Sequence, residues 1–215
     1  MIVKELEQFH NALKEDSRIA SIFDSYQNII APFILQLEIL DGEYPIEILN
    51  EIRSIFTHLA RSANSDSIEV YEDNIIKAER HIKRATLDCF KYLCVSFDDY
   101  YKGFEKMYNG VDLSFVDNGQ FLPELCKKRN SSIGLLQTAK KKELNTSNVD
   151  DIFHDYELAY NAYSEVYEMI NGSYEKFENL KIRAIKKARY RKILDFCGII
   201  GTLFGIIGVI LTIFK

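Results

Sequence analysis

The sequence predicts an all-α protein: a helical bundle whose long C-terminal helix continues into one transmembrane helix. Three observations lead to this prediction. Apolar residues recur every three or four positions along most of the chain, which is the spacing of an amphipathic helix. No run with the two-residue period of a β-strand is sustained. The chain also ends in a long apolar run, and its 47% apolar and 27% charged residues are typical of a folded protein.

The elements follow in order from these patterns. A first helical segment is expected over residues 5–40, broken near Pro32, because proline lacks a backbone donor. Pro45 is placed to start the next helix, and the turn signals Asn109-Gly110 and Asn118-Gly119 make residues 103–119 irregular. Further helices are expected over residues 46–62, 68–101, 121–143 and 150–192, the last interrupted only at Asn171-Gly172. We therefore divide the chain into a bundle (1–149), a long helix with a basic neck (150–192) and a transmembrane helix (193–214).

Charge is distributed unevenly along the chain. Residues 181–192, which we call the basic neck, contain seven basic residues and no acidic one. The 180 residues before the neck carry 19 bases and 31 acids, a net charge of −12 that the total of −5 hides. An acidic bundle of this kind is not a general nucleic-acid binder, because nonspecific phosphate binding needs a positive surface.

The apolar run at the end of the chain predicts a membrane span. Nineteen residues from Phe196 to Phe214 carry no charge, and with Ile193 and Leu194 they reach the ~20 residues that cross a bilayer as a helix. A buried core helix is the alternative interpretation, but such a helix usually keeps a polar stripe. The basic neck before the span places the N-terminal bundle in the cytoplasm. We expect a single-pass membrane protein.

Two features of the C-terminal half predict helix–helix contact. Four glycines, spaced 3, 4 and 3, allow close approach of helix backbones and favour a homo-oligomer. Seven mostly aromatic residues upstream, which we call the tyrosine series, are spaced at alternating intervals of four and three. That series packs either within one subunit or between subunits. The glycines are Gly198, Gly201, Gly205 and Gly208, and the tyrosine series is Tyr156, Tyr160, Tyr163, Tyr167, Ile170, Tyr174 and Phe177.

Continued in phase, the tyrosine series reaches a polar or small face of the span. Asp195 near the hydrocarbon is costly unless it is paired, and Arg191 lies one turn earlier. Either Asp195 extends into headgroup water, or a ring of such carboxylates at the mouth of a multi-helix pore favours cations. The predicted pore-lining residues are Asp195, Gly198, Thr202, Gly205 and Thr212.

A second candidate site lies in the bundle. If the helices over residues 46–62 and 68–101 pack antiparallel, five basic or imidazole side chains gather in one place. Such a cluster suits phosphate or another anion, because arginine binds oxyanions through two parallel hydrogen bonds. The alternative is a helix face with solvated arginines and hydrogen-bonded histidines. The cluster consists of Arg53, His58, Arg61, His81 and Arg84.

Arg53 and His58 resemble the Arg-(x)4-His signature of the HEPN superfamily, all-α domains common in prokaryotic defence and toxin–antitoxin systems. The resemblance implies that Arg53 stabilises a phosphate and His58 acts as acid or base, at a site formed where two such helices meet in a dimer. Ser54 departs from the family pattern, since ribonucleases of the family often carry Asn, Asp or His after the arginine. The layout of the whole chain is similar to the HEPN-like membrane partner of type VI CRISPR systems and to the Hailong membrane effector. This resemblance implies a location in the bacterial inner membrane.

Three functions remain open. The first is an oligomeric anti-phage membrane effector, a pore or ion channel of at least about four copies, gated by an anionic nucleotide or oligonucleotide. The layout implies a nucleotidyltransferase or CRISPR effector as partner. The alternatives are a membrane-anchored HEPN-type ribonuclease using Arg53 and His58, and a non-enzymatic tail-anchored scaffold. No cofactor or metal is expected, because the four histidines lack metal-ligand spacing and no C-x-x-C pair occurs.

Overall fold

The computed structural model describes residues 16–146 and 148–213, the last six of these by their backbone only. Every regular element in these residues is helical, which confirms the all-α prediction. The helices are α2 (Ser17–Ser25), the π-helical turn η1 (Tyr26–Ile30), α3 (Ala31–Asp41), α4 (Ile46–Ala63), α5 (Ile68–Met107), the 3-10 segment η2 (Leu113–Gly119), α6 (Phe121–Glu143), α7 (Val149–Asn171) and α8 (Tyr174–Ile213).

The break expected near Pro32 is a change of helix type. The π-helical turn η1 ends one residue before α3, in whose first turn Pro32 lies. A π-turn absorbs the hydrogen bond that proline cannot donate, so the three pieces run on as one helical segment. Its predicted start, before residue 16, lies outside the described residues.

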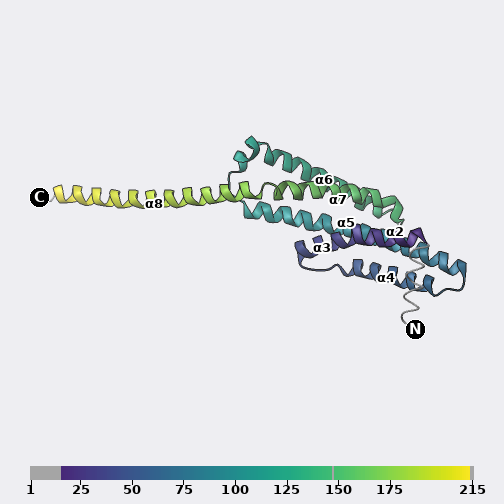
Figure 1. Cartoon of the computed structure of the whole chain (residues 1–215). Helices are drawn as coiled ribbons and strands as arrows, with labels where there is room; N and C mark the ends of the chain where they lie inside the picture. The colour runs from purple at the N-terminus through teal and green to yellow at the C-terminus, as the bar shows by residue number, and fades with distance from the viewer. Residues whose placement is uncertain (1–15, 147, 214–215) are drawn as a thin grey trace, which may run out of the picture.

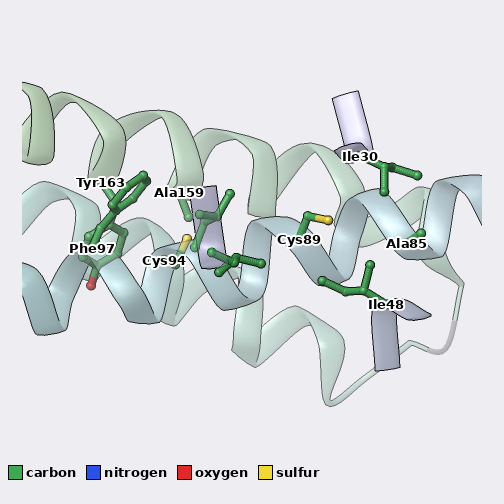
Figure 2. Packing of buried hydrophobic residues seen from close by; sticks show 10 residues of the cluster. Ile30, Ile48, Ala85, Cys89, Cys94, Phe97, Ala159 and Tyr163 are labelled. Atoms are coloured by element: carbon green, nitrogen blue, oxygen red, sulfur yellow. The ribbon is translucent and has the colours of Figure 1, made fainter. Parts of the chain in front are cut away.

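The central element is α5, a helix of 40 residues. Its N-terminal half packs against α2 and α4, and further along it packs against α3 and α7, with α6 covering α7 (Figure 1). Figure 2 shows the middle of this core, where Cys89 and Cys94 of α5 lie among aliphatic and aromatic side chains of other helices. Burial raises the pKa of both thiols to about 12. These two cysteines behave as small apolar residues, whereas Cys126 and Cys197 are exposed.

The long C-terminal helix differs from all others. The predicted interruption is confirmed, since α7 ends at Asn171 and α8 begins at Tyr174. Only the first turns of α8 rest on the bundle, and the remainder extends away from it as a single helix (Figure 1). Forty residues of α-helix are about 60 Å long. Every residue from Ile185 to Ile207 is exposed.

Candidate functional site

The two histidines of the predicted anion cluster do meet. Helices α4 and α5 are joined by a short loop and pack against each other, which brings the rings of His58 and His81 to 5.2 Å between centroids. The rings are stacked, with 18° between their planes, and both side chains are half-buried. The sequence predicted this proximity from an antiparallel pairing of the two helices.

Hydrogen bonds fix the orientation of both rings. Nδ1 of His58 lies 2.9 Å from Oδ1 of Asn74, whose amide nitrogen donates to the backbone oxygen of Val70. Because that amide is oriented by its own hydrogen bond, His58 is the donor at Nδ1. Nδ1 of His81 lies 2.5 Å from Oε2 of Glu51. Both rings therefore use Nδ1, and Nε2 of each is the atom left for other chemistry.

The arginines of the cluster lie elsewhere. Arg53 and Arg61 lie on the exposed face of α4 instead of beside the histidines. Five residues separate Arg53 from His58, so the two side chains point about 140° apart around the helix. Within the described residues, no ion pair involves Arg53, Arg61 or Arg84. In one chain, the structure thus brings His58 and His81 together and leaves Arg53 and Arg61 facing solvent.

Arg84 lines a separate cleft of about 280 Å³ between α5 and the start of α7, together with Arg80, Lys83, Asn148, Val149 and Asp150. Lys83 already pairs there with Asp150. No group of three or more His, Cys, Asp or Glu side chains in the described part of the chain is arranged to hold a metal ion.

The tyrosine series packs within one chain, in agreement with the first of its two interpretations. Tyr160 stacks on Phe90 at 5.1 Å between ring centroids, and Tyr167 stacks on Phe97 at 4.9 Å. Tyr174, however, is 49% exposed. The first part of the predicted helix–helix contact is therefore the core between α5 and α7.

The buried residues of α7 and early α8 follow a slightly different register. We call them the buried series, and they too are spaced at alternating intervals of four and three. Continued at the same spacing, the buried series meets all four glycines of α8 in succession. A strict seven-residue repeat stays on one face only if the helices supercoil. The buried series consists of Ile152, Tyr156, Ala159, Tyr163, Val166, Ile170, Ser173 and Phe177.

The predicted pore-lining residues lie on the projecting part of α8. Asp195, Gly198, Thr202 and Gly205 are all exposed, and no ion pair forms between Arg191 and Asp195. The Thr202 hydroxyl donates to the backbone oxygen of Gly198 at 2.8 Å. A methyl group added at Gly198, Gly201 or Gly205 would meet nothing within 4 Å apart from the adjoining backbone of α8 itself. The side chain of Thr212 lies outside the described residues.

No helix in the described part of the chain is both long enough and apolar enough to cross a membrane. The predicted span of residues 193–214 continues beyond Ile207, the last residue whose side chain is described.

No protein family, curated protein or solved structure matches the chain. The resemblance to HEPN-like membrane effectors therefore stays a prediction from the sequence.

Proposed function

We propose that the protein is an oligomeric, single-span effector of the bacterial inner membrane, in which several copies of α8 form an ion-conducting pore below a cytoplasmic helical bundle. The observation that carries the proposal is the projection of α8 from the bundle with its apolar side chains uncovered. Phe204 is 69% exposed and Leu203 is 55% exposed. Apolar surface in water costs about 25 cal/mol per Å², so such a helix needs lipid or protein around it.

The charges next to this helix support one orientation. The basic neck carries seven bases and is exposed from Ile185 onward. Bases beside a membrane span stay on the cytoplasmic side and meet anionic headgroups. The acidic bundle then lies in the cytoplasm, and α8 holds it at a distance from the bilayer.

The glycines support self-association. Each glycine within a helix costs about 1 kcal/mol relative to alanine. Nothing within the chain explains that cost at Gly198, Gly201 or Gly205, because a methyl group at these positions would meet no atom. Close contact with α8 of another copy supplies a reason, since small residues let helix backbones approach in the membrane.

A pore follows from assembly and from the polar groups on the same region of α8. One span per chain encloses no water, so conduction requires several copies. Asp195 near the cytoplasmic mouth then forms a ring of carboxylates, which favours cations. Opening this path depolarises the cell, and an anionic nucleotide or oligonucleotide is the proposed trigger. A partner nucleotidyltransferase or CRISPR effector belongs to this proposal as the source of the trigger.

Planar-bilayer recording of the purified full chain tests the proposal. We expect single-channel conductance with cations favoured over anions, and a loss of that preference in Asp195→Asn, which keeps the size of the side chain. Phe196→Leu, one position away on α8, is the matched control and leaves the selectivity unchanged. A chain that floats with liposomes yet never conducts, with or without nucleotides, is an anchored scaffold instead.

The stacked histidines favour a second candidate, the membrane-anchored ribonuclease. Both rings are held by their Nδ1 atoms, which leaves Nε2 of His58 to accept or donate a proton. RNA cleavage lost in His58→Ala but retained in Asp195→Ala supports the ribonuclease. The reverse result in a cell-survival assay, with His58→Ala active and Asp195→Ala inactive, supports the pore.

A further inference from the structure

A cleft lies where α8 leaves the bundle. Its volume is about 350 Å³, within the range of small-ligand pockets. One wall comes from the η2 region and the other from four residues of α8 on the bundle-facing side. We call it the root cleft, and its lining consists of Asp112, Phe115, Leu180, Arg183, Ala184 and Lys187.

The aromatic ring in the root cleft is that of Phe115, which belongs to η2. Asp117 and Asn118 have positive φ angles of 49° and 55°, and Gly119 follows with 86°. Three successive left-handed residues turn the chain sharply. Just before this turn, Phe115 is 74% exposed at the edge of the cleft, whereas Leu113 and Val116 are buried in the nearby core.

The α8 wall supplies positive charge. Arg183 and Lys187 are one helical turn apart, so their side chains lie on the same face about 6 Å from each other. Both are exposed, and within the described residues neither forms an ion pair. An arginine and a lysine at this spacing suit a phosphate group, which takes charge-assisted hydrogen bonds from both.

We propose that the root cleft binds a nucleotide-sized phosphate ester, with its phosphate between Arg183 and Lys187 and its aromatic base against Phe115. An exposed aromatic face binds a nucleobase by stacking, whichever base it is. The effect of this binding on the protein rests on the proposed pore function. A ligand in this cleft touches the bundle and the pore helix at once, so its binding energy acts on the angle between them.

The phosphate has two sources, a soluble ester or a lipid headgroup, and distances along α8 favour the first. Arg183 lies ten residues before Ile193, or about 15 Å along the helix, and Lys187 lies about 9 Å before it. The headgroup layer on each side of a bilayer is only about 5–8 Å thick. A phospholipid therefore does not reach Arg183 when α8 crosses the bilayer upright.

Asp112 opposes the ligand. Its carboxylate accepts hydrogen bonds from the backbone nitrogen and the hydroxyl of Ser114, at 3.0 and 2.6 Å. These bonds, with the charge of Lys187, lower the pKa of Asp112 below its usual value, so the cleft contains a fixed negative charge. Removing that charge alone makes the cleft more attractive to phosphate, and asparagine keeps the hydrogen bonds to Ser114.

The chain contains no tryptophan, so Phe115→Trp gives a single fluorescent reporter in the cleft. We expect ATP to quench this tryptophan in the full-length protein in zwitterionic detergent at about 0.15 M salt, and inorganic phosphate to compete. Calorimetry on the native chain provides the same affinity without the reporter. In the reporter chain, Arg183→Gln with Lys187→Gln is expected to weaken ATP binding at least tenfold, and Asp112→Asn is expected to tighten it about threefold.

The matched control removes the same charge from the neck outside the cleft. Arg189→Gln with Lys192→Gln is expected to change the affinity less than about threefold, because these side chains point about 160° and about 140° away from Lys187 around α8, into solvent where salt screens them. Equal weakening by the two double variants shows nonspecific attraction to the basic neck and overturns the proposal. A reporter that responds to vesicles containing phosphatidylglycerol but not to ATP overturns it in favour of a lipid headgroup.

Flotation with liposomes, measured on the same protein, separates this proposal from the proposed function. A chain that inserts and conducts but leaves ATP unbound contradicts the root cleft alone. A chain that binds ATP at the cleft but never enters liposomes contradicts the membrane pore alone.

Discussion

Helices α7 and α8 are consecutive, and the spacing of buried residues in α7 returns as small and apolar residues in the second half of α8, after Lys187 and Arg191 of the neck. The α7 residues are buried, whereas those in the second half of α8, up to Gly205, are exposed. In α7 the buried series faces α5 and α6, and the members that lie within α7 are at most 4% exposed. In α8 the same spacing continues through Gly198, Gly201 and Gly205, where nothing in the chain lies close. The same spacing is therefore covered within the chain on one side of the neck and uncovered on the other, and the proposed self-association would cover its second half.

The two regions should differ most in the unfolding free energy that is lost when a phenylalanine is replaced by alanine. Phe177→Ala empties a fully buried site that holds the ring against Phe104 and Phe121, and it should cost about 3–5 kcal/mol of unfolding free energy. Phe204→Ala, the same change on bare α8, should leave the unfolding of the bundle unchanged. Denaturant unfolding in mild detergent, followed by circular dichroism, measures both. A loss of bundle stability in Phe204→Ala would contradict the view that this part of α8 makes no contact with the bundle.

Alkaline pH should destabilise the bundle before it affects α8. Burial raises the pKa of Cys89 and Cys94 to about 12. The unfolded chain releases these protons first, so this stability is complete below about pH 8.5 and is lost as pH rises towards 12, at about 1.4 kcal/mol per pH unit for each group. Unfolding curves between pH 7 and 11 measure the slope, and Cys89→Ala with Cys94→Ala should reduce it. If these substitutions leave the slope unchanged, the buried thiols are not the cause of the alkaline loss of stability.

A carboxylate in each region provides the next contrast. Asp16 caps α2 by accepting from the backbone of Arg18 at 2.9 Å, and it also accepts from the Tyr71 hydroxyl at 2.8 Å. The guanidinium of Arg18 also donates to both carboxylate oxygens of Asp16, at 3.1 and 2.7 Å, and it has the largest effect on the carboxyl. Together these partners hold the pKa of Asp16 well below its usual range, so its contribution is present above about pH 4 and is lost as pH falls. Asp16→Asn should cost about 1–3 kcal/mol at pH 7.

Asp195→Asn is the comparison for Asp16→Asn, and it should leave bundle stability unchanged, because Asp195 has no ion-pair partner in the described part of the chain. Thermal unfolding of both variants at pH 7 and pH 3 measures how much each substitution changes the stability of the bundle. Equal effects of the two substitutions at pH 7 would mean that Asp195 is held by the bundle, contrary to the structure.

The smallest effect is expected on the surface of the bundle. Lys77 and Asp73 form an exposed pair one turn apart on α5, with 2.6 Å between nitrogen and oxygen. Lys77→Ala should change the unfolding free energy by about 0.5 kcal/mol or less, because such pairs are solvated and screened. A larger loss would mean that this face of α5 is covered in the assembled protein.

The sequence was sufficient for the elements whose signals are local. Pro45 starts α4 and Asn171-Gly172 ends α7, as predicted. The meeting of His58 with His81 also followed from one assumption, an antiparallel pairing of two neighbouring helices. The direction of Arg53, about 140° from His58, is a matter of helix phase and was open to the same reasoning.

Two features depend on contacts between distant residues. Tyr160 and Tyr167 suggested a register that puts aromatics in the core, but the small Ala159 and the branched Val166 are the fully buried neighbours. Helix spacing alone does not decide between adjacent positions when both are apolar. The root cleft depends on the left-handed turn at Asp117 and Asn118, which brings η2 beside α8. No repeat or motif in the sequence marks that contact.

Disulfide cross-linking in native membranes tests the central claim, that α8 completes its register with other copies of itself. Cys126 and Cys197, the two exposed cysteines, are first replaced by serine, and the buried Cys89 and Cys94 remain. Single cysteines are then placed at Gly205 or at Leu203, which point about 160° apart around α8. We predict covalent dimers from Gly205→Cys and almost none from Leu203→Cys. Equal or reversed cross-linking, in chains that are inserted in the membrane, would contradict the account.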